Sequence, residues 1–162
     1  MFIFIGYAYY KDVSSKVIFS SDGKSDYEAV RSTFKTTLTK TGPAPQEYED
    51  IKITDDAEEI TYKSGELELK AWVSKYIDKS KKNPAVVYVH GDFTFREDNW
   101  DQTKEFMNLG FVVMTPMLRG ENGNPGCFEF LHGEVDDIIA AGEYLANQPY
   151  IDKKIFFLQV IV

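Results

Sequence analysis

A short apolar stretch near the middle of the chain ends in residues that often carry chemistry. Residues 85–93 read AVVYVHGDF, and an apolar run that ends in His-Gly is typical of a buried strand turning into a catalytic loop. His90 and Asp92 are the titratable side chains of this loop. The last serine of the chain is Ser80, upstream of the loop, so no serine that could serve as a nucleophile follows it in this sequence.

Two other groupings of side chains suggest chemistry, and both have simpler interpretations. The His-Gly-Asp and His-Gly-Glu motifs contain zinc-ligand types, but they share none of the helical zinc spacings. Cys127 and His132 would make a thiol and its base, yet a reactive thiol needs a source of pKa depression, and NPGCFEF is typical of a surface loop. We therefore expect no metal and no cofactor. The four side chains of the two motifs are His90, Asp92, His132 and Glu134.

Length and composition indicate one globular domain. The 162 residues are enough for a hydrophobic core, and a net charge of −8 argues against nucleic acid as a partner, because phosphate binding needs a cationic face. The single Cys127 excludes an intrachain disulfide, and no apolar run reaches the length of a membrane span. The opening MFIFIGYAYY lacks the basic region and cleavage site of a signal peptide. We expect a cytoplasmic protein, unless an export signal is missing from the start.

The first 50 residues are expected to form an N-terminal extension. Residues 1–24 show no clean periodicity. SDYEAVRSTFKTTL predicts a helix that begins with a capping box of Ser25 and Glu28, and TGPAPQ ends it because proline cannot continue a helix. The apolar face of this helix would consist of Tyr27, Val30, Phe34 and Leu38.

Residues 51–162 alternate strands with helices, a pattern that predicts a parallel sheet. EITYK and ELELKAWVS alternate polar and apolar residues around Ser64-Gly65, which indicates a β-hairpin. PAVVYVH and FVVMTP are continuous apolar runs, as in strands buried on both faces, and KKIFFLQVIV is predicted to be a last apolar strand. The predicted fold class is therefore α/β, a mixed sheet with parallel strands at its centre, flanking helices and an antiparallel hairpin at one edge.

Two helices are predicted between the central strands. NWDQTKEFMNLG would end at Gly110, and GEVDDIIAAGEYLANQ carries acidic residues in its first turns, where the helix dipole favours them. Seven apolar side chains are expected to face the core: Trp100, Phe106 and Leu109 on the first helix, and Val135, Ile138, Ile139 and Leu145 on the second.

This order of elements, with His90-Gly91 at the end of the first central strand, resembles the α/β-hydrolase fold. More narrowly, it resembles the catalytic domain of serine peptidases of the prolyl oligopeptidase type (peptidase S9) and their dienelactone-hydrolase-like relatives. PAVVYVHGDF is similar to their strand and HGG-type loop, GFVVMTPMLRGENGNPG to the next strand and its Arg-Gly turn, and HGEVDDIIAAGEYLANQPYIDKKIFFL to the helix and strand before the nucleophile. The resemblance implies an incomplete α/β-hydrolase domain, whose intact relatives hydrolyse peptide or ester bonds with a Ser-Asp-His triad.

The position of the family's nucleophile falls at the end of this sequence. In the family, the strand matching IFFL leads into a G-x-S-x-G elbow. The family pattern would place Ala-Gly-His-Ser over positions 159–162, where this chain has Gln-Val-Ile-Val. Gln-Val-Ile-Val can be written CAG GTC ATA GTN, and with one G in front the same letters read GCA GGT CAT AGT, which is Ala-Gly-His-Ser. We hypothesise a one-nucleotide frameshift beside Leu158 and a chain that is inactive as it stands.

The resemblance also implies roles for the loop after the first central strand. The backbone N–H groups of Asp92 and Phe93, which follow His90-Gly91, match the family's oxyanion donors. The family usually has glycine at the position of Asp92, but aspartate tolerates left-handed conformations better than most residues. His90 is expected to bond neighbouring loops. The family's catalytic aspartate and histidine lie beyond the nucleophile, so we expect no triad residue in this chain.

Charged residues farther along are expected to be structural. Arg119 would hold the long loop MLRGENGNPGCFEF together by bonding backbone carbonyls or an acidic neighbour. Asp136 and Asp137 would face solvent or Arg119.

The C-terminal strand supports a second hypothesis from a different class. IFFLQVIV has no charge and no proline, so an exposed edge of this kind invites self-association or strand addition by a partner. One hypothesis is therefore the N-terminal portion of a serine hydrolase, which takes a small-molecule or peptide substrate in the intact family. The other is a non-catalytic α/β module that binds a partner through its open sheet edge.

Overall fold

The structure is a computed structural model that describes residues 29, 32–33 and 41–161. The chain divides into two compact units, Tyr9–Lys40 and a larger one that contains Thr41–Val162. Residues 1–24 and most of the helix predicted from Ser25 lie outside the described residues. The domain boundary expected after residue 50 stays a prediction.

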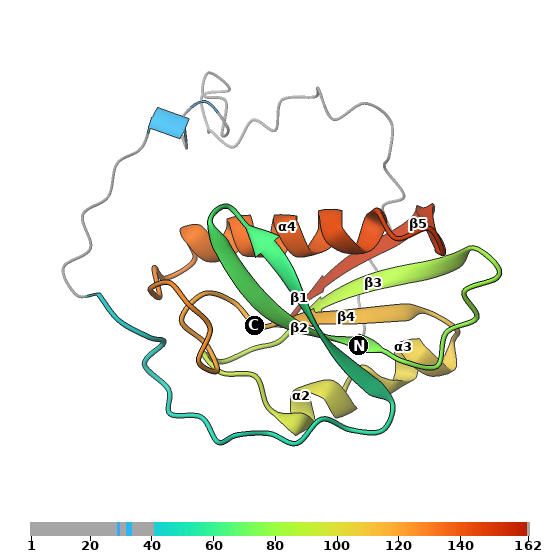
Figure 1. Ribbon diagram of the computed structural model, residues 1–162, viewed down its shortest axis with the longest axis horizontal. Helices are drawn as coiled ribbons and strands as arrows, with labels where there is room; N and C mark the ends of the chain where they lie inside the picture. The colour runs from blue at the N-terminus through green and yellow to red at the C-terminus, as the bar shows by residue number, and fades with distance from the viewer. Residues whose placement is uncertain (1–28, 30–31, 34–40, 162) are drawn as a thin grey trace. The chain divides into compact units, whose positions relative to one another are not determined.

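A mixed sheet forms the centre of the larger unit (Figure 1). β3, β4 and β5 run parallel to one another, while β1 and β2 form an antiparallel hairpin at one edge. The predicted fold class is confirmed. The strands are β1 (Ala57–Ser64), β2 (Leu67–Ser74), β3 (Asn83–Val89), β4 (Val112–Pro116) and β5 (Ile151–Val160), in the order β1-β2-β4-β3-β5.

Helices cover both faces of this sheet (Figure 1). α4 (Gly133–Ala146) packs on one face, and α2 (Glu97–Asp101) and α3 (Lys104–Asn108) lie on the other. The connection from β3 to β4 and the connection from β4 to β5 cross the sheet in opposite directions. Because such crossovers are right-handed, their helices fall on opposite faces.

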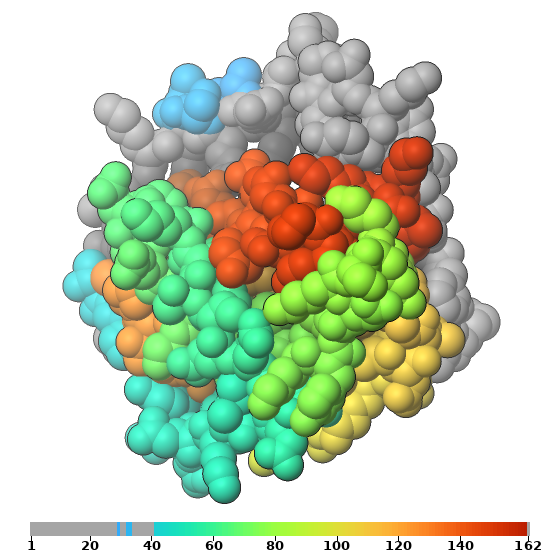
Figure 2. Space-filling model, turned by 45° about the vertical axis from the view of Figure 1, so that its right-hand side comes forward, coloured from blue at the N-terminus to red at the C-terminus, as the bar shows by residue number. Residues whose placement is uncertain are grey.

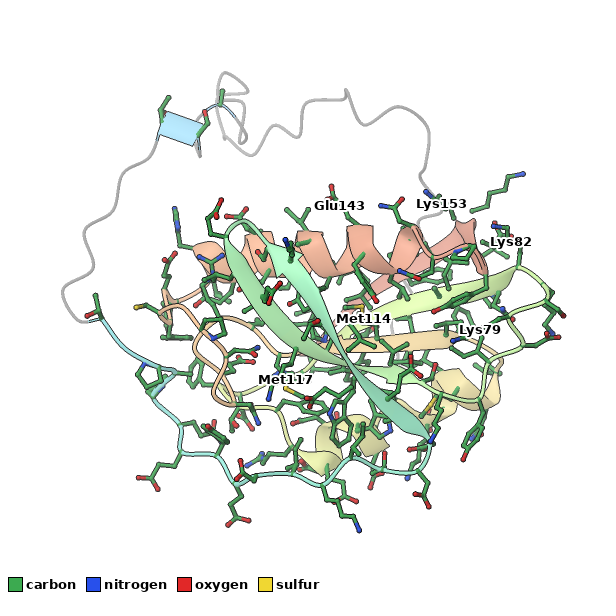
Figure 3. The ribbon with its side chains drawn as sticks, viewed as in Figure 1. Lys79, Lys82, Met114, Met117, Glu143 and Lys153 are labelled. Carbon is green, nitrogen blue, oxygen red and sulfur yellow. The ribbon has the colours of Figure 1, made fainter. Side chains whose placement is uncertain are left out.

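Each face of the sheet has its own hydrophobic core. The core beneath α4 includes Leu69, Met114 and Leu145, and the core beneath α2 is built around Trp72 and Trp100. The two indole rings meet edge to face with their centroids 5.7 Å apart, an arrangement that aromatic pairs prefer. Figure 3 shows Met114 and Met117 in the interior, where they belong to different cores.

The predicted hairpin and the helix before β5 are confirmed. Ser64 pairs with Leu67 across a tight turn, and Gly65 has a φ of 56°, a left-handed conformation that glycine adopts without steric cost. Glu134 and Asp136 lie in the first turn of α4, where the helix dipole favours negative charge.

Two predicted core positions are wrong. Leu109 is 73% exposed and Ile139 is 52% exposed. The first predicted helix is in fact two short helices, α2 and α3, so the helical period does not carry through to Leu109. On α4 the buried stripe contains two acids, and Ile139 lies off it. The stripe consists of Glu134, Asp137, Ala141 and Leu145, and Val135 and Ile138 are half-buried beside it.

A pair of leucines tests this description of the core. Leu69→Ala, at a fully buried position, should lower the free energy of unfolding by about 2–5 kcal/mol, because it removes apolar contacts and leaves a cavity. Leu109→Ala, at a mostly exposed position, should change it by less than about 0.5 kcal/mol. Urea denaturation followed by tryptophan fluorescence measures both, and equal losses in the two variants would contradict the assignment.

Candidate active-site region

The carboxyl ends of the parallel strands meet at one edge of the sheet, which is where open α/β sheets bind their ligands. The loop after β3 begins with His90, the long loop 117–132 follows β4, and Ile161 follows β5. The Ile161 N–H donates to the carbonyl of Val89 at 3.0 Å. A Cβ added to Gly91 would stand 3.6 Å from Cγ2 of Ile161. The end of β5 therefore lies directly beside the predicted oxyanion loop.

Asp92 forms a left-handed turn directly after Gly91. Its φ is 66°, in the left-handed region that aspartate tolerates better than most residues. Its carboxylate accepts a hydrogen bond from Arg96 Nη2 at 2.9 Å, and both side chains are about half exposed. The carboxylate is thus neutralised by a cation four residues along the chain.

His90 is buried beneath the loop and contacts its neighbours through both ring nitrogens. Nδ1 lies 2.8 Å from the Gly91 carbonyl oxygen, and Nε2 lies 3.2 Å from Oε2 of the buried Glu121. The two side chains form an ion pair when His90 is protonated. Burial alone would lower the pKa of His90, but Glu121 and the Gly91 carbonyl outweigh burial and raise it.

Asn122 ties the loop after β3 to the long loop after β4. Its side-chain oxygen accepts the N–H of Phe95 at 2.8 Å and lies 3.2 Å from the Thr94 hydroxyl. Its amide nitrogen donates to the Phe95 carbonyl at 2.8 Å. One side chain thus satisfies both backbone groups of Phe95 and fixes the spacing between the two loops.

The second predicted oxyanion donor already has a partner. The Phe93 N–H donates to the side-chain oxygen of Gln46 at 3.2 Å. Gln46 belongs to the segment before β1, and nothing in its sequence context suggested a place in this site.

Arg119 anchors the long loop to α4, as predicted, with Asp137 as its acidic neighbour. The guanidinium donates from Nε and Nη2 to the two oxygens of the fully buried Asp137 at 2.9 and 2.8 Å. The Asp137 carboxylate also accepts the Arg119 backbone N–H and the Ser64 hydroxyl. Ser64 lies at the end of β1, so this carboxylate joins the loop, the helix and the hairpin.

The residues of the metal and thiol alternatives are engaged elsewhere. Glu134 is buried and accepts the Glu129 N–H at 2.6 Å, and Nδ1 of His132 lies 3.2 Å from the Glu129 carboxylate. Cys127 is free and half-buried. Among the residues that the structure describes, no three or more His, Cys, Asp and Glu side chains are grouped to hold a metal ion.

Within the described segments, no helix is long and apolar enough to cross a bilayer.

Comparison with known proteins identifies the fold of the chain. The sequence matches no family model and no curated protein. An esterase of Pyrococcus furiosus superposes with a TM-score of 0.56 at 16% identity, over 78% of this chain and 47% of the esterase. The α/β hydrolase GrgF of a Penicillium species superposes with a TM-score of 0.55 at 17% identity, over 65% of this chain and 37% of GrgF. An esterase of Pyrobaculum calidifontis superposes with a TM-score of 0.52 at 23% identity, over 65% of this chain and 35% of that esterase.

The chain therefore has an α/β-hydrolase fold. It spans between about a third and a half of the length of these hydrolases.

The raised pKa of His90 predicts how the stability of the fold depends on pH. A histidine with a raised pKa in the folded state contributes stability that is fully present below its ordinary pKa of 6.5 and is lost as pH rises through the raised value. The free energy of unfolding should therefore fall as pH rises above about 6.5. His90→Gln should remove this fall, and so should Glu121→Gln, which keeps the shape of the partner without its charge.

Urea denaturation at a series of pH values measures the effect. If His90→Gln leaves the fall in the free energy of unfolding with pH unchanged, a group other than His90 titrates in this pH range.

Proposed function

We propose that this chain is the N-terminal portion of a serine hydrolase of the prolyl oligopeptidase or dienelactone-hydrolase type. Its intact form would cleave peptide or ester bonds in a small-molecule or peptide substrate. The portion at hand would supply the oxyanion loop, and the remainder would supply the nucleophile, the catalytic aspartate and the catalytic histidine. Without that remainder the chain would be inactive, because acyl transfer of this kind needs all of these groups together.

The position of Ile161 is the observation that carries this proposal. In a hydrolase of this type, the nucleophile follows the strand that corresponds to β5. It lies close enough to the oxyanion donors for the substrate's reacting carbonyl group to fit between them. Here Val160 pairs with Val89, the Ile161 N–H donates to the Val89 carbonyl, and a Cβ on Gly91 would stand 3.6 Å from Cγ2 of Ile161. A serine one residue farther along would come next to the Asp92 and Phe93 N–H groups.

The coding argument supplies that serine. If Gln-Val-Ile-Val is encoded as CAG GTC ATA GTN, the shifted frame would read Ala-Gly-His-Ser over positions 159–162, which would begin the expected elbow. A one-nucleotide shift beside Leu158 would therefore replace the nucleophile without altering any element up to that point of β5.

Repairing the frame should restore hydrolysis. The gene with one added G before the codon for Gln159, continued through the downstream reading frame, should yield a protein that hydrolyses a p-nitrophenyl ester. Alanine in place of the serine encoded at position 162 in the repaired frame should reduce kcat by at least about 10⁴-fold, because the nucleophile is lost. The unrepaired chain, purified in the same way, is the second control.

The DNA sequence beyond the codon for Val162 tests the proposed hydrolase before any assay. A downstream frame without Gly-His-Ser-x-Gly and a later Asp and His would refute the proposal.

The exposed side of β5 favours a second candidate function, a module that binds a partner by strand addition. β5 pairs with β3, and no described strand pairs with its other side. Its apolar side chains remain accessible, and Figure 2 shows red residues of this region at the surface. An apolar strand edge of this kind recruits another strand. The exposed apolar residues at this edge are Ile155, Leu158, Val160 and Ile161.

A charge placed on this edge should block association. Leu158 is 57% exposed, and Leu158→Lys should shift the chain from oligomer to monomer in sedimentation velocity, because pairing would bury the new ammonium group. Ile139→Lys is the matched control, since it adds the same charge at a 52% exposed position on α4 and should leave the distribution unchanged. A parent chain that is already monomeric would argue against the edge as a binding surface.

A further inference from the structure

The segment before β1 is attached to the long loop that follows β4. The Ala44 N–H donates to the Gly120 carbonyl at 2.9 Å, and the Phe128 N–H donates to the Gly42 carbonyl at 3.0 Å. A Cβ on Gly120 would stand 3.2 Å from the Ala44 nitrogen, and Gly120 has a φ of 74°. The segment and the loop therefore approach as closely as they do because position 120 is glycine.

Gln46 lies two residues beyond Ala44 and is half-buried. Two residues farther along, Tyr48 lies beside the same long loop, since its hydroxyl is 2.8 Å from the point where a Cβ of Gly123 would stand. The Gln46 side chain is held over the loop after β3, where its oxygen accepts the Phe93 N–H at 3.2 Å.

We propose that Gln46 is a built-in cap of the oxyanion site. This inference rests on the proposed function, in which the Phe93 N–H is an oxyanion donor. The side-chain amide of glutamine carries the same C=O group as a scissile peptide bond, so its oxygen accepts from this donor as a substrate carbonyl would. A substrate must displace Gln46 before its own oxygen reaches Phe93.

Displacement weakens substrate binding and leaves the chemical step unchanged. A neutral hydrogen bond at an exposed position contributes a small net free energy, which corresponds to about a 2- to 10-fold change in KM. Gln46→Ala should therefore raise kcat/KM of the frame-repaired enzyme by about 2- to 10-fold through KM alone. Gln46→Glu should lower kcat/KM below the parent, because a carboxylate accepts more strongly than an amide oxygen.

The contact is tested first in the chain as it exists. Hydrogen exchange of the Phe93 amide, measured by mass spectrometry, should be faster in Gln46→Ala than in the parent. Glu47→Ala removes the adjacent exposed side chain and should leave that exchange rate unchanged. Equal exchange rates in the parent and in Gln46→Ala would overturn the cap without involving catalysis.

The inhibitory role is then tested in the frame-repaired enzyme with a p-nitrophenyl ester as substrate. A lower KM in Gln46→Ala, with kcat and the Glu47→Ala control unchanged, supports the cap. An unchanged or lower kcat/KM in Gln46→Ala overturns the cap while the hydrolase assignment stands. Absence of hydrolysis in the repaired parent and all variants refutes the proposed function, and the cap with it.

Discussion

The pairing of β3 with parallel neighbours on both sides is the constraint on which the rest of the structure depends. Parallel pairing brings the carboxyl ends of β4, β3 and β5 to one edge, so the loops that follow them must pack against one another. The register sets how they meet, because Val89 pairs with Val160, and the next residue, Ile161, donates its N–H to the Val89 carbonyl beside Gly91. Lys82 and Lys153, at the amino ends of β3 and β5, lie at the opposite end of the sheet (Figure 3).

Buried charge organises that edge more than apolar packing does. Arg119 and the fully buried Asp137 form a two-point ion pair that also includes Ser64, and His90 lies against the buried Glu121. Ion pairs of this kind add little stability over apolar side chains of the same size. Removing one partner is nevertheless destabilising, because it leaves the other charge buried and unpaired. Their effect here is to favour the loop arrangement in which Arg119 meets Asp137 and His90 meets Glu121.

The sequence was enough to predict the sheet, the hairpin at Ser64-Gly65 and the helix α4, since each has a strong period or a turn residue. It was not enough to predict which side of a helix faces inward when the inward residues are charged. Asp137 is fully buried because Arg119 meets it from a distant loop, whereas Ile139 is exposed. From the sequence, Arg119 and solvent were the two possibilities for Asp137, and the helical pattern does not choose between them. Gln46 was missed for the same reason, since its contact with Phe93 spans 47 positions of the chain.

Three side chains that precede α4 help to hold the loop after β3 in its turn. Arg96 pairs with Asp92, Asn122 brackets Phe95, and Gln46 accepts from Phe93. Electrostatic stabilisation of a transition state depends on donors fixed before the substrate arrives. Under the proposed function, a loop held in this way would present its N–H groups to a substrate without rearrangement. In the structure the Phe93 N–H has the Gln46 side-chain oxygen as its acceptor, since donors in folded proteins are rarely left without one.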